Sequence, residues 1–375
     1  MKKTIKALLV FTVVLLGLSA CVGSDITVGQ IPPPPPRPVP PAVATPAQGA
    51  PVAAAAATGD AVTADVPEGE VFTLSFAHNM NTTHPRGYAT EVFAQRIAER
   101  SGGRLVVNTF PYAQLGSDAE VANQVLQGHI DITSIISPNL SFITPALSVF
   151  DLPYLFFDME QAQAALSGTL GDHIGGILAD EGLVLLGFQT AGFKHLTNNV
   201  RPITSVQDMD GLRMRVSQSH FLVAQFQAIN AGGISIPWGE LPAALAEGLA
   251  DGQENPLTTI IAAGLHNVQN YLTISNHGFA AYPVIMAAES YNQLPEDLRL
   301  ILHEVFREVN PIQWNLIAEA EVEQLAYLYD AGMNVNYLSA DAMRGFRAAM
   351  QVVYDEFAQI PGGATLLSVA ARYTN

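Results

Sequence analysis

Short apolar stretches alternate with helical stretches from Val71 to near the C-terminus. The stretch VFTLSFAHN is typical of a strand, and PRGYATEVFAQRIAERSGG, which follows it, is typical of an amphipathic helix that ends at Gly102 and Gly103. Ser117 and Glu120 have the spacing of a capping box ahead of a second helix. This alternation predicts an α/β fold whose strands are largely parallel and buried on both faces. Further strands are expected in RLVVNTF, IDITSII, LVLLGFQT, LRMRV, ISIP and YLTIS.

Length and composition favour a well-buried protein of two domains. The chain of 375 residues is too long for one small core, and it is 49% hydrophobic but only 14% charged. A formal net charge of -17 repels nucleic acid and anionic lipid headgroups, so neither is expected as a partner. The acidity does not fix the sign of a ligand, because a buried site can be locally cationic.

The first 20 residues predict a signal peptide. Lys2, Lys3 and Lys6 precede the apolar run ALLVFTVVLLGL, which is shorter than the roughly 20 residues of a membrane span. Cys21, the only cysteine, comes next after the small residues that close this run, and its place resembles the lipobox of bacterial lipoproteins. The resemblance implies an exported protein, in the periplasm or on the outer face of the cell membrane, with a lipid anchor at Cys21. The alternative is an incidental cysteine in an ordinary signal peptide.

Residues 21–70 predict a disordered tether that follows the anchor. The segment is rich in proline and alanine, contains IPPPPPRPVPP, and lacks the aromatic residues and the periodicity of a folded core. A proline-rich ligand for a signalling domain is the alternative interpretation, but beside a lipid anchor a spacer is favoured.

One long helical stretch runs from Pro295 to about Gly332. A long helix near the end of a two-domain α/β chain suggests a strut that connects the domains. Pro311 lies inside the stretch and is expected to kink or break it, because its ring removes a backbone donor and clashes with the preceding turn.

The common catalytic and metal-binding patterns are missing from the sequence. It contains no phosphate loop of the type GxxxxGK[ST], no GxSxG nucleophile elbow and no HExxH zinc motif. Its nine histidines show no metal-ligand clustering. We therefore expect no enzymatic activity, no metal and no cofactor.

Three segments favour binding instead: GFKHLTNNVRPI, DGLRMRV and PWGELPAALAEGLADGQENPL. Strand alternation places Arg213 and Arg215 on one face of a strand. In the third segment, Gly252 is expected to end a helix with positive φ, and Asn255 lies near the N-cap of the next helix. There Asn255 either caps the helix or helps to bind an anion.

From about Phe72 to Phe357 the chain resembles the periplasmic solute-binding proteins of TRAP transporters, the tripartite ATP-independent systems, and in particular their dicarboxylate-binding, DctP-like members. The match is specific, because several of its segments are long, in order and correctly spaced. These segments are FAHNMNTTHP, FPYAQLGSDAE, GHIDIT, FDLPYLFFD, GFKHLTNNVRPI, DMDGLRMRV, IPWGELPAALAEGLADGQENP and VQNYLTISNH.

The resemblance implies a fold and a function. The fold consists of two α/β lobes, joined by crossing strands and a long helix, that close over a ligand like a clam shell. Lobe I is expected at 71–190 with 279–314, and lobe II at 191–278 with 315–375. Such a protein captures a small organic acid, here a 2-oxo acid, a four-carbon dicarboxylate or a sugar acid, and delivers it to two membrane permease subunits for sodium-coupled uptake. A ligand-sensing protein of the same fold and a lyase of organic acids stay open as alternatives.

The family motif Gly-Leu-x-x-Arg-Val assigns the ligand carboxylate to Arg215. Its planar guanidinium can hold a carboxylate through two parallel hydrogen bonds. It is also the later of the two arginines, and in open α/β sheets ligands bind beyond the carboxyl ends of the strands. Arg213 is expected at the outer end of the strand, paired with Asp208 or Asp210.

The resemblance implies further site residues. Asn255 matches the amide that contacts the ligand, and Trp238 matches an aromatic wall of the pocket, with core packing as the alternative for Trp238. Lys194 stands where many relatives have arginine, so a contact with a second carboxylate stays open. Ile136 stands where sialate-binding members carry an acid, which argues against sialic acid. From lobe I, the residues expected to face the cleft are His78, Asn79, Ser137 and Asn139.

Overall fold

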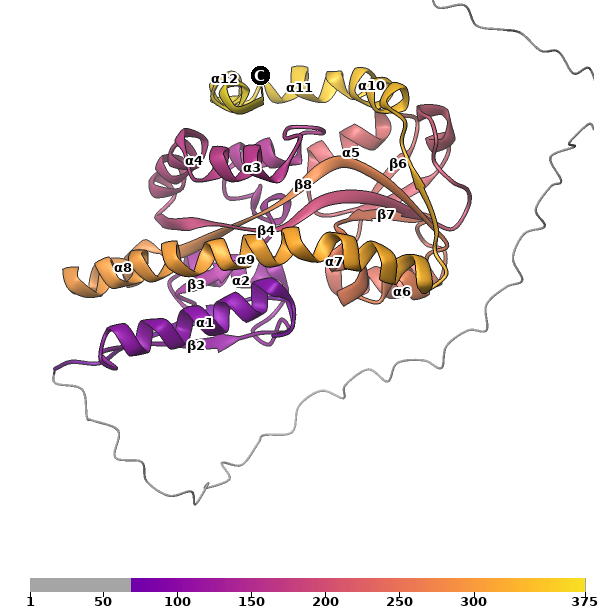
Figure 1. Ribbon diagram of the computed structural model, residues 1–375. Helices are drawn as coiled ribbons and strands as arrows, with labels where there is room; N and C mark the ends of the chain where they lie inside the picture. Colours follow the sequence, from indigo (N-terminus) through magenta and orange to yellow (C-terminus); the bar gives the residue numbers. More distant parts are fainter. Residues whose placement is uncertain (1–68, 375) are drawn as a thin grey trace, which may run out of the picture. The chain divides into compact units, whose positions relative to one another are not determined.

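The computed structural model describes residues 69–374, so the expected signal peptide, Cys21 and nearly all of the expected tether lie outside the described residues. A nine-stranded sheet runs through this part of the chain, with helices packed against it (Figure 1). In chain order the strands are β1 (Phe72–Ala77), β2 (Leu105–Phe110), β3 (Ile132–Ser134), β4 (Leu183–Asn198), β5 (Arg213–Val216), β6 (Gly232–Ser235), β7 (Gly252–Asn255), β8 (Tyr271–Ala287) and β9 (Asn334–Tyr337). The helices are α1 (Pro85–Arg100), α2 (Asp118–Leu126), α3 (Met159–Leu166), α4 (Thr169–Asp180), α5 (His220–Gln227), α6 (Leu241–Ala246), α7 (Leu257–Ala262), α8 (Ala288–Gln293), α9 (Glu296–Asp330), α10 (Ala340–Ala349), α11 (Gln351–Phe357) and α12 (Gly363–Thr374).

The sheet is mixed. Its strands follow the order β2-β1-β3-β8-β4-β7-β5-β6, and β9 pairs with β8. Neighbours are parallel towards both edges, as the alternation predicts, because β1 pairs with β2 and β3, and β5 pairs with β6 and β7. The long strands β4 and β8 are antiparallel to each other and to β7 and β3, which the alternation does not predict. We call β1, β2 and β3 the β1 end of the sheet, and β5, β6 and β7 the β5 end.

Strands β4 and β8 are much longer than the sequence predicts. Strand β4 continues from LVLLGFQT through GFKHLTN without a break, and β8 extends well beyond YLTIS. The extension of β4 is hard to recognise in the sequence because Lys194, His195 and Thr197 are polar and yet buried. Both strands cross the middle of the described part in Figure 1 and connect its two ends.

A glycine allows β4 to pass close to helix α9. Gly187 lies at the first of three register shifts in the pairing of β4 with β8, and its φ is 150°. A Cβ at this position would lie 2.5 Å from a ring carbon of Phe306 in α9, which is closer than any real carbon contact. The close packing of strand and helix therefore requires glycine here.

The first two helices have the boundaries that the sequence predicts. Helix α1 ends at Arg100, and Gly102 and Gly103 follow with φ values of 60° and 80°. Ser117 and Glu120 form both hydrogen bonds of a capping box at the start of α2.

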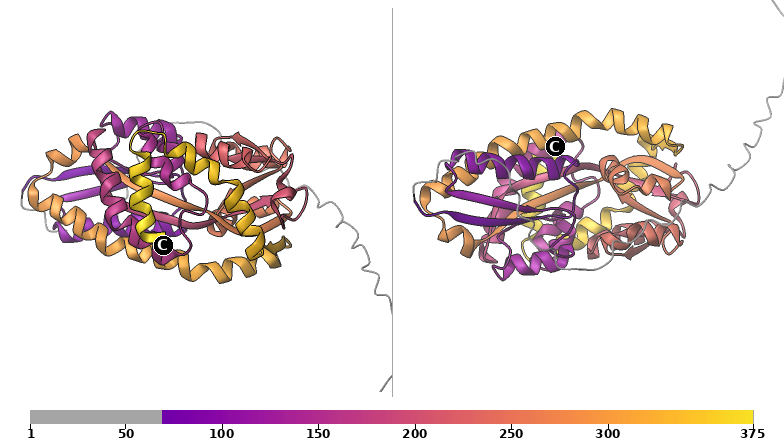
Figure 2. Two further views of the ribbon diagram at one scale, coloured as in Figure 1. Left: turned by 90° about the horizontal axis from the view of Figure 1, so that it is seen from above. Right: turned by 90° about the horizontal axis from the view of Figure 1, so that it is seen from below.

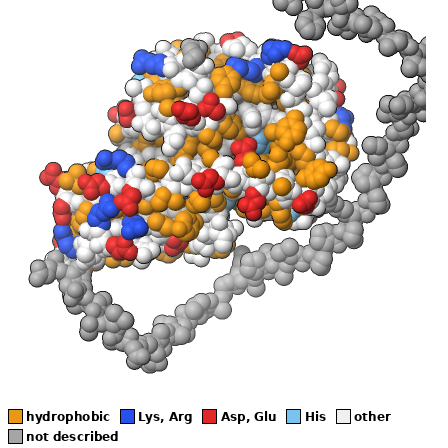
Figure 3. All heavy atoms as spheres, viewed as in Figure 1, with side chains coloured by type: hydrophobic (Ala, Val, Ile, Leu, Met, Phe, Trp, Pro, Cys, Tyr) orange, Lys and Arg blue, Asp and Glu red, His pale blue; other side chains and the backbone are white. Residues whose placement is uncertain are grey.

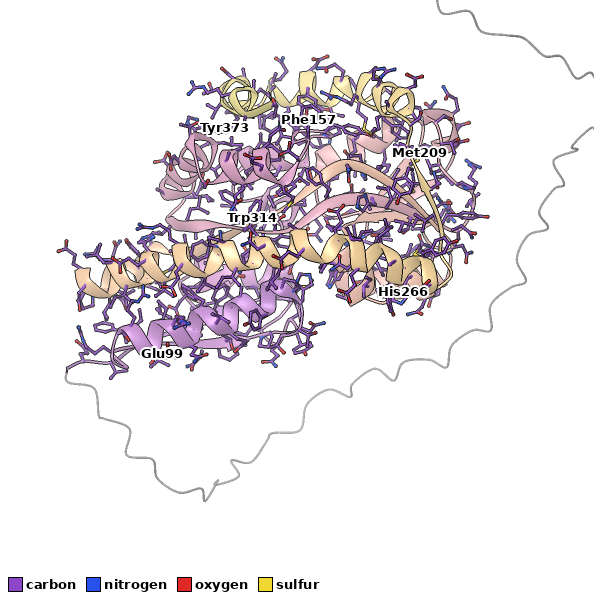
Figure 4. All side chains as sticks on the ribbon, in the orientation of Figure 1. Glu99, Phe157, Met209, His266, Trp314 and Tyr373 are labelled. Carbon is purple, nitrogen blue, oxygen red and sulfur yellow. The ribbon has the colours of Figure 1, made fainter. Side chains whose placement is uncertain are left out.

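Helix α9 is continuous over 35 residues although Pro311 lies inside it, so the predicted break does not occur. It packs against α1, β4 and α7 and runs along one side of the described part (Figures 1 and 2). Beside the proline, Asn310 Nδ2 and Trp314 Nε1 each donate to the Phe188 carbonyl of β4 at 2.9 Å. Trp314 is labelled where α9 passes β4 in Figure 4. These bonds hold the helix to the strand on both sides of Pro311.

The C-terminal helix α12 packs on α3 and α4. Its side chains Leu366 and Val369 belong to the same apolar cluster as Phe150 and Leu170, and the Tyr373 hydroxyl accepts from the backbone N–H of residue 169 at 2.9 Å. Figure 2 shows α10, α11 and α12, in yellow, lying across the body. The expected division assigns α12 to lobe II, whereas α3 and α4 belong to the segment expected as lobe I.

The surface mixes basic and acidic side chains. Basic and acidic side chains are interspersed on the face shown in Figure 3. Arg100, the last residue of α1, pairs with Glu308 of α9 at 2.5 Å, and Arg104 pairs with Asp297 of α9 at 2.5 Å. Among the helices of residues 69–374, none is both long and apolar enough to cross a membrane.

Candidate functional site

The carboxyl ends of two pairs of parallel strands, β1 with β3 and β5 with β7, meet around one small cavity. Asn79 and Asn139 follow β1 and β3, while Ser217 follows β5 and Asn255 ends β7. Ligands of open α/β sheets bind at such strand ends. The cavity has a volume of about 20 Å³, which is room for about one water molecule. The residues that line it are Asn79, Met80, Asp118, Ile136, Asn139, Arg215, Ser217, Trp238, Asn255, Thr259 and Tyr282.

The structure brings most of the predicted site residues together and leaves three outside the lining. Asn79, Asn139, Arg215, Trp238 and Asn255 line the cavity, and they come from both ends of the sheet. The predicted residues that are buried but do not line it are His78, Ser137 and Lys194. The lining residues that the sequence did not reveal are Met80, Asp118, Ser217, Thr259 and Tyr282.

Arg215 is a buried cation held by a neutral group. Its side chain is 3% exposed, and its Nε and Nη2 donate to the Ile236 carbonyl at 2.9 and 2.7 Å. Burial lowers the pKa of Arg215 to about 10, against the opposing effect of Glu254 and Asp118. The guanidinium therefore stays charged at neutral pH, and within the described residues it forms no ion pair.

The DGQENP segment forms strand β7, not the junction of two helices. Asn255 ends the strand and Pro256 is the N-cap of α7, so the alternative that Asn255 only caps a helix is wrong. The prediction that Gly252 ends a helix is also wrong, because α6 is followed by Gly248, whose φ is 71°. A Cβ on Gly252 would lie 2.2 Å from the carbonyl oxygen of Thr197 in β4, so glycine is needed for the two strands to pair.

Lys194 belongs to a buried network behind the cavity. Its Nζ lies 2.7 Å from Glu254 Oε1, and His277 Nε2 lies 2.9 Å from Glu254 Oε2. Burial raises the pKa of Glu254, but Lys194 and His277 lower it by more, so the resulting pKa is about 2. Lys194 therefore fixes Glu254, the neighbour of Asn255 in β7, and does not reach the lining.

Asp118 orients two of the predicted amides. Its Oδ1 accepts from Asn79 Nδ2 at 2.9 Å, and its Oδ2 accepts from Asn139 Nδ2 at 2.7 Å. Burial raises the pKa of Asp118, while the hydrogen bond from Asn139 and the charge of Arg86 lower it less. The sequence carried no distinct signal for this residue, because an acid in the first turn of a helix is ordinarily favoured by the helix dipole.

Two hydrogen bonds join the β1 end to the loop after β5. Asn139 Oδ1 accepts from the backbone N–H of Gln218 at 3.1 Å, and Ser219 Oγ donates to Asp151 Oδ2 at 2.6 Å. Asp151 is 2% exposed, and burial raises its pKa to about 7 although Lys194 lowers it. These contacts link residues that line or flank the cavity from opposite sides.

Arg213 lies on the same strand as Arg215 but on the surface. Its Nη2 lies 2.6 Å from Asp251 Oδ1, so the predicted pairing with Asp208 or Asp210 is wrong. Asp251 immediately precedes β7, the neighbour of β5, which brings it to Arg213. Arg201 instead donates to the backbone carbonyls of Asp208 and Asp210, at 2.8 and 2.5 Å.

A larger hollow of about 610 Å³ lies between α4, β4 and α9. It is lined mainly by apolar side chains, such as Leu166, Phe306 and Trp314, and it does not contain the guanidinium and amides that converge at the strand ends. In residues 69–374 no group of three or more His, Cys, Asp or Glu side chains is placed to hold a metal ion. We therefore take the cavity at the strand ends as the candidate site.

Comparison with known proteins places the chain in a family. The family model described as bacterial extracellular solute-binding protein, family 7, matches residues 76–360. The C4-dicarboxylate-binding periplasmic protein DctP of Rhodobacter capsulatus is 29% identical over 307 residues, which are 80% of this chain and 91% of that protein. The uncharacterized protein y4mM of Sinorhizobium fredii is 31% identical over 254 residues, 68% of this chain, but the match spans only 47% of that longer protein.

A solved structure supports the same assignment. The TRAP periplasmic solute binding protein of Sulfurospirillum deleyianum, with bound succinate, has a TM-score of 0.76 and 28% sequence identity, and the match covers 82% of this chain and all of that one. The crossing strands β4 and β8 and the helix α9 accordingly connect the lobes of the two-lobed fold that the resemblance implied. The chain therefore belongs to the bacterial extracellular solute-binding protein family 7, the solute-binding proteins of TRAP transporters, and it is a binding protein rather than an enzyme.

Proposed function

We propose that this protein is the extracytoplasmic receptor of a TRAP transporter and binds a small organic acid by its carboxylate at Arg215. The observation that carries the proposal is a buried guanidinium, bound to a neutral carbonyl, in a cavity lined from both ends of the sheet. Nη1 makes neither bond to Ile236, and Nη2 has a second N–H. The edge formed by these two nitrogens can therefore hold a carboxylate through two parallel hydrogen bonds.

The rest of the lining suits the carbon chain of such an acid and the hydroxyl groups on it. Asn79 donates through Nδ2 to Asp118, while its Oδ1 is buried and has no hydrogen-bond partner among residues 69–374. This oxygen can accept from a ligand hydroxyl, and Trp238 supplies an apolar wall. The relative from R. capsulatus is named for C4-dicarboxylates and the solved relative contains succinate. These observations support a four-carbon dicarboxylate, a 2-oxo acid or a sugar acid.

Binding requires the two lobes to separate and close. A cavity of about 20 Å³ is far smaller than the few hundred Å³ of ordinary ligand sites, so the acid enters when Asn139 and Gln218 part. The bound acid then favours the closed form through contacts with both lobes, since a ligand shifts the equilibrium between two forms only by the difference in its affinity for them. We assign lobe I to 71–190 with 279–314 and lobe II to 191–278 with 315–375, with α12 packed back onto α3 and α4.

The cellular setting follows from the same proposal. The protein is exported through its signal peptide at residues 1–20, anchored by lipid at Cys21 and held away from the membrane by residues 21–70. It delivers the bound acid to two permease subunits, which couple uptake to sodium.

A thermal-shift screen of the purified protein tests the proposal. Succinate, malate, 2-oxo acids and sugar acids are compared with neutral sugars and amines, and any ligand that co-purifies is identified by mass spectrometry. At least one acid should raise the melting temperature of the wild type and leave that of Arg215→Ala unchanged. Stabilisation by neutral sugars or amines alone would contradict the proposal.

A further inference from the structure

Arg86 is a second buried cation near the cavity, and it is poorly paired. It is 1% exposed, its Nη2 donates to the Ser134 carbonyl at 2.9 Å, and its guanidinium carbon lies 3.4 Å from the centre of the Tyr282 ring. Its Nε and Nη1 are buried and have no hydrogen-bond partner in the described part of the chain. A buried charge with unpaired donors is unfavourable, so this arrangement calls for an acceptor.

Two neutral histidines add further donors beside Arg86. His84 Nδ1 accepts from the backbone N–H of Arg86 at 3.1 Å, so the proton of the neutral ring lies on Nε2. Burial, followed by the charge of Arg86, lowers the pKa of both His78 and His84 to about 3. His84 Nε2 and both ring nitrogens of His78 are buried and make no hydrogen bond to residues 69–374. Each neutral ring therefore offers one N–H.

These groups lie on the β1 side of the candidate site, opposite Arg215. His78 precedes Asn79, which lines the cavity, and the Tyr282 ring that stacks on Arg86 lines it too. Asp118 stabilises the charges of both Arg86 and Arg215, but it gives its oxygens to amides. Stacking on Tyr282 occupies the face of the guanidinium, so its Nε and Nη1 edge remains as a rigid pair of donors.

We propose that His78, His84 and Arg86 form a second anion subsite, which binds the distal carboxylate of the ligand while Arg215 binds the first. The inference rests on the proposed function and narrows the ligand to an acid with two anionic groups. The Tyr282 ring contacts Arg86 and lines the cavity together with Arg215. The subsite becomes accessible when the lobes separate.

Isothermal titration with matched acids tests the subsite. Succinate is compared with butyrate and glutarate with pentanoate, because each pair has the same carbon number and differs by one carboxylate. The wild type should bind the preferred diacid at least about tenfold more tightly than its partner. Arg86→Met, which keeps the apolar stem, should remove that preference by weakening the diacid alone.

A second variant covers the case in which Arg86→Met fails to fold. In His84→Asn the side-chain oxygen can still accept from the N–H of Arg86 and cap α1, but the Nε2 donor is lost. His84→Asn should bind the diacid several-fold more weakly than the wild type does, and its affinity for the monoacid should be unchanged. If the variants lost affinity equally for the diacid and the monoacid, or if the wild type did not prefer the diacid, the subsite would be overturned. The proposed function fails in a different way: Arg215→Ala would then bind the acid like the wild type. If the wild type bound no acid at all, both the subsite and the proposed function would be overturned.

Discussion

Lys194 Nζ lies 2.7 Å from Glu254 Oε1, and their side chains are only 4% and 2% exposed. The pair explains why a lysine can stand in β4 at this place without contacting a ligand. Its role is to neutralise Glu254, which His277 holds from the other side, and thereby to fix the strand that ends in Asn255. The possibility that Lys194 binds a second carboxylate finds no support in this geometry.

Removing Lys194 should destabilise the protein strongly. Lys194→Met leaves Glu254 buried with His277 as its remaining partner, which should reduce the free energy of unfolding by about 3–5 kcal/mol. Arg213→Met is the matched control, because the pair of Arg213 with Asp251 is partly exposed and such exposed pairs contribute little to stability. Urea unfolding measures both. If both variants lost similar amounts of unfolding free energy, Lys194 would not be the essential partner of Glu254. The double variant Lys194→Met with Glu254→Gln should recover part of the stability that Lys194→Met loses, because no buried charge is left unpaired.

Gln313 should contribute as much to the stability of the fold as an apolar core residue does. The pairing of β4 with β8 shifts between Thr190 and Gly192, and the Gln313 side chain accepts from the Thr190 N–H at 3.0 Å and donates to its carbonyl at 2.6 Å. Gln313→Leu leaves both backbone groups unpaired, at a cost of about 1–3 kcal/mol each.

The control for this variant lies on the same helix. Gln324 accepts one hydrogen bond from Thr258 and is not fully buried, so Gln324→Leu should cost about 1 kcal/mol. Chemical denaturation compares the two variants, and equal effects would show that Gln313 does not stabilise the shifted register of β4.

Asp151 should make stability depend on pH. Its folded-state pKa of about 7 lies above its ordinary value of 3.8, so the folded protein holds the proton more tightly. The stability that this provides is fully present below about pH 4 and is lost as the pH rises through about 7. Relative to Asp151→Asn, the unfolding free energy of the wild type should fall by about 1.4 kcal/mol per pH unit in this window.

Asp251 provides a control of opposite sign for the pH experiment. The Arg213 guanidinium lowers the pKa of Asp251, so Asp251 stabilises the protein above its ordinary pKa and this contribution is lost as the pH falls. If the unfolding free energies of the wild type and Asp151→Asn changed in parallel with pH, the folded protein would not hold Asp151 protonated. The charged neighbours of Asp151 are Lys194 and Glu254.

The sequence predicted the elements that follow simple periodicity. Helix α1 with Gly102 and Gly103, and the capping box at Ser117, are set by local rules of helix termini and were confirmed. The continuation of β4 was missed because Lys194 is buried as an ion pair with a residue 60 positions away, which periodicity cannot show. Helix α9 passes through Pro311 because bonds from Asn310 and Trp314 to β4 hold it in place.

The candidate site was predictable only in part. The strand motifs and the family resemblance identified Arg215, Asn255 and Trp238, which the structure brings to one cavity. Tyr282 was missed because β8 approaches the site from a distant part of the chain, beside β3. Arg86 was missed because nothing in the helical pattern of α1 distinguishes a buried arginine from an exposed one, although it is 1% exposed in the fold.

The most direct test of the account is the dissociation constant of the organic acid for Arg215→Ala and Arg213→Ala, measured by isothermal titration calorimetry beside the wild type. The two arginines lie two residues apart on β5, so both variants perturb the same strand. Arg215→Ala should weaken binding by about 100-fold or more, because two charge-assisted hydrogen bonds are lost, while Arg213→Ala should stay within about threefold of the wild type. If Arg215→Ala bound the acid as tightly as the wild type, the central claim that Arg215 holds the ligand carboxylate would be wrong.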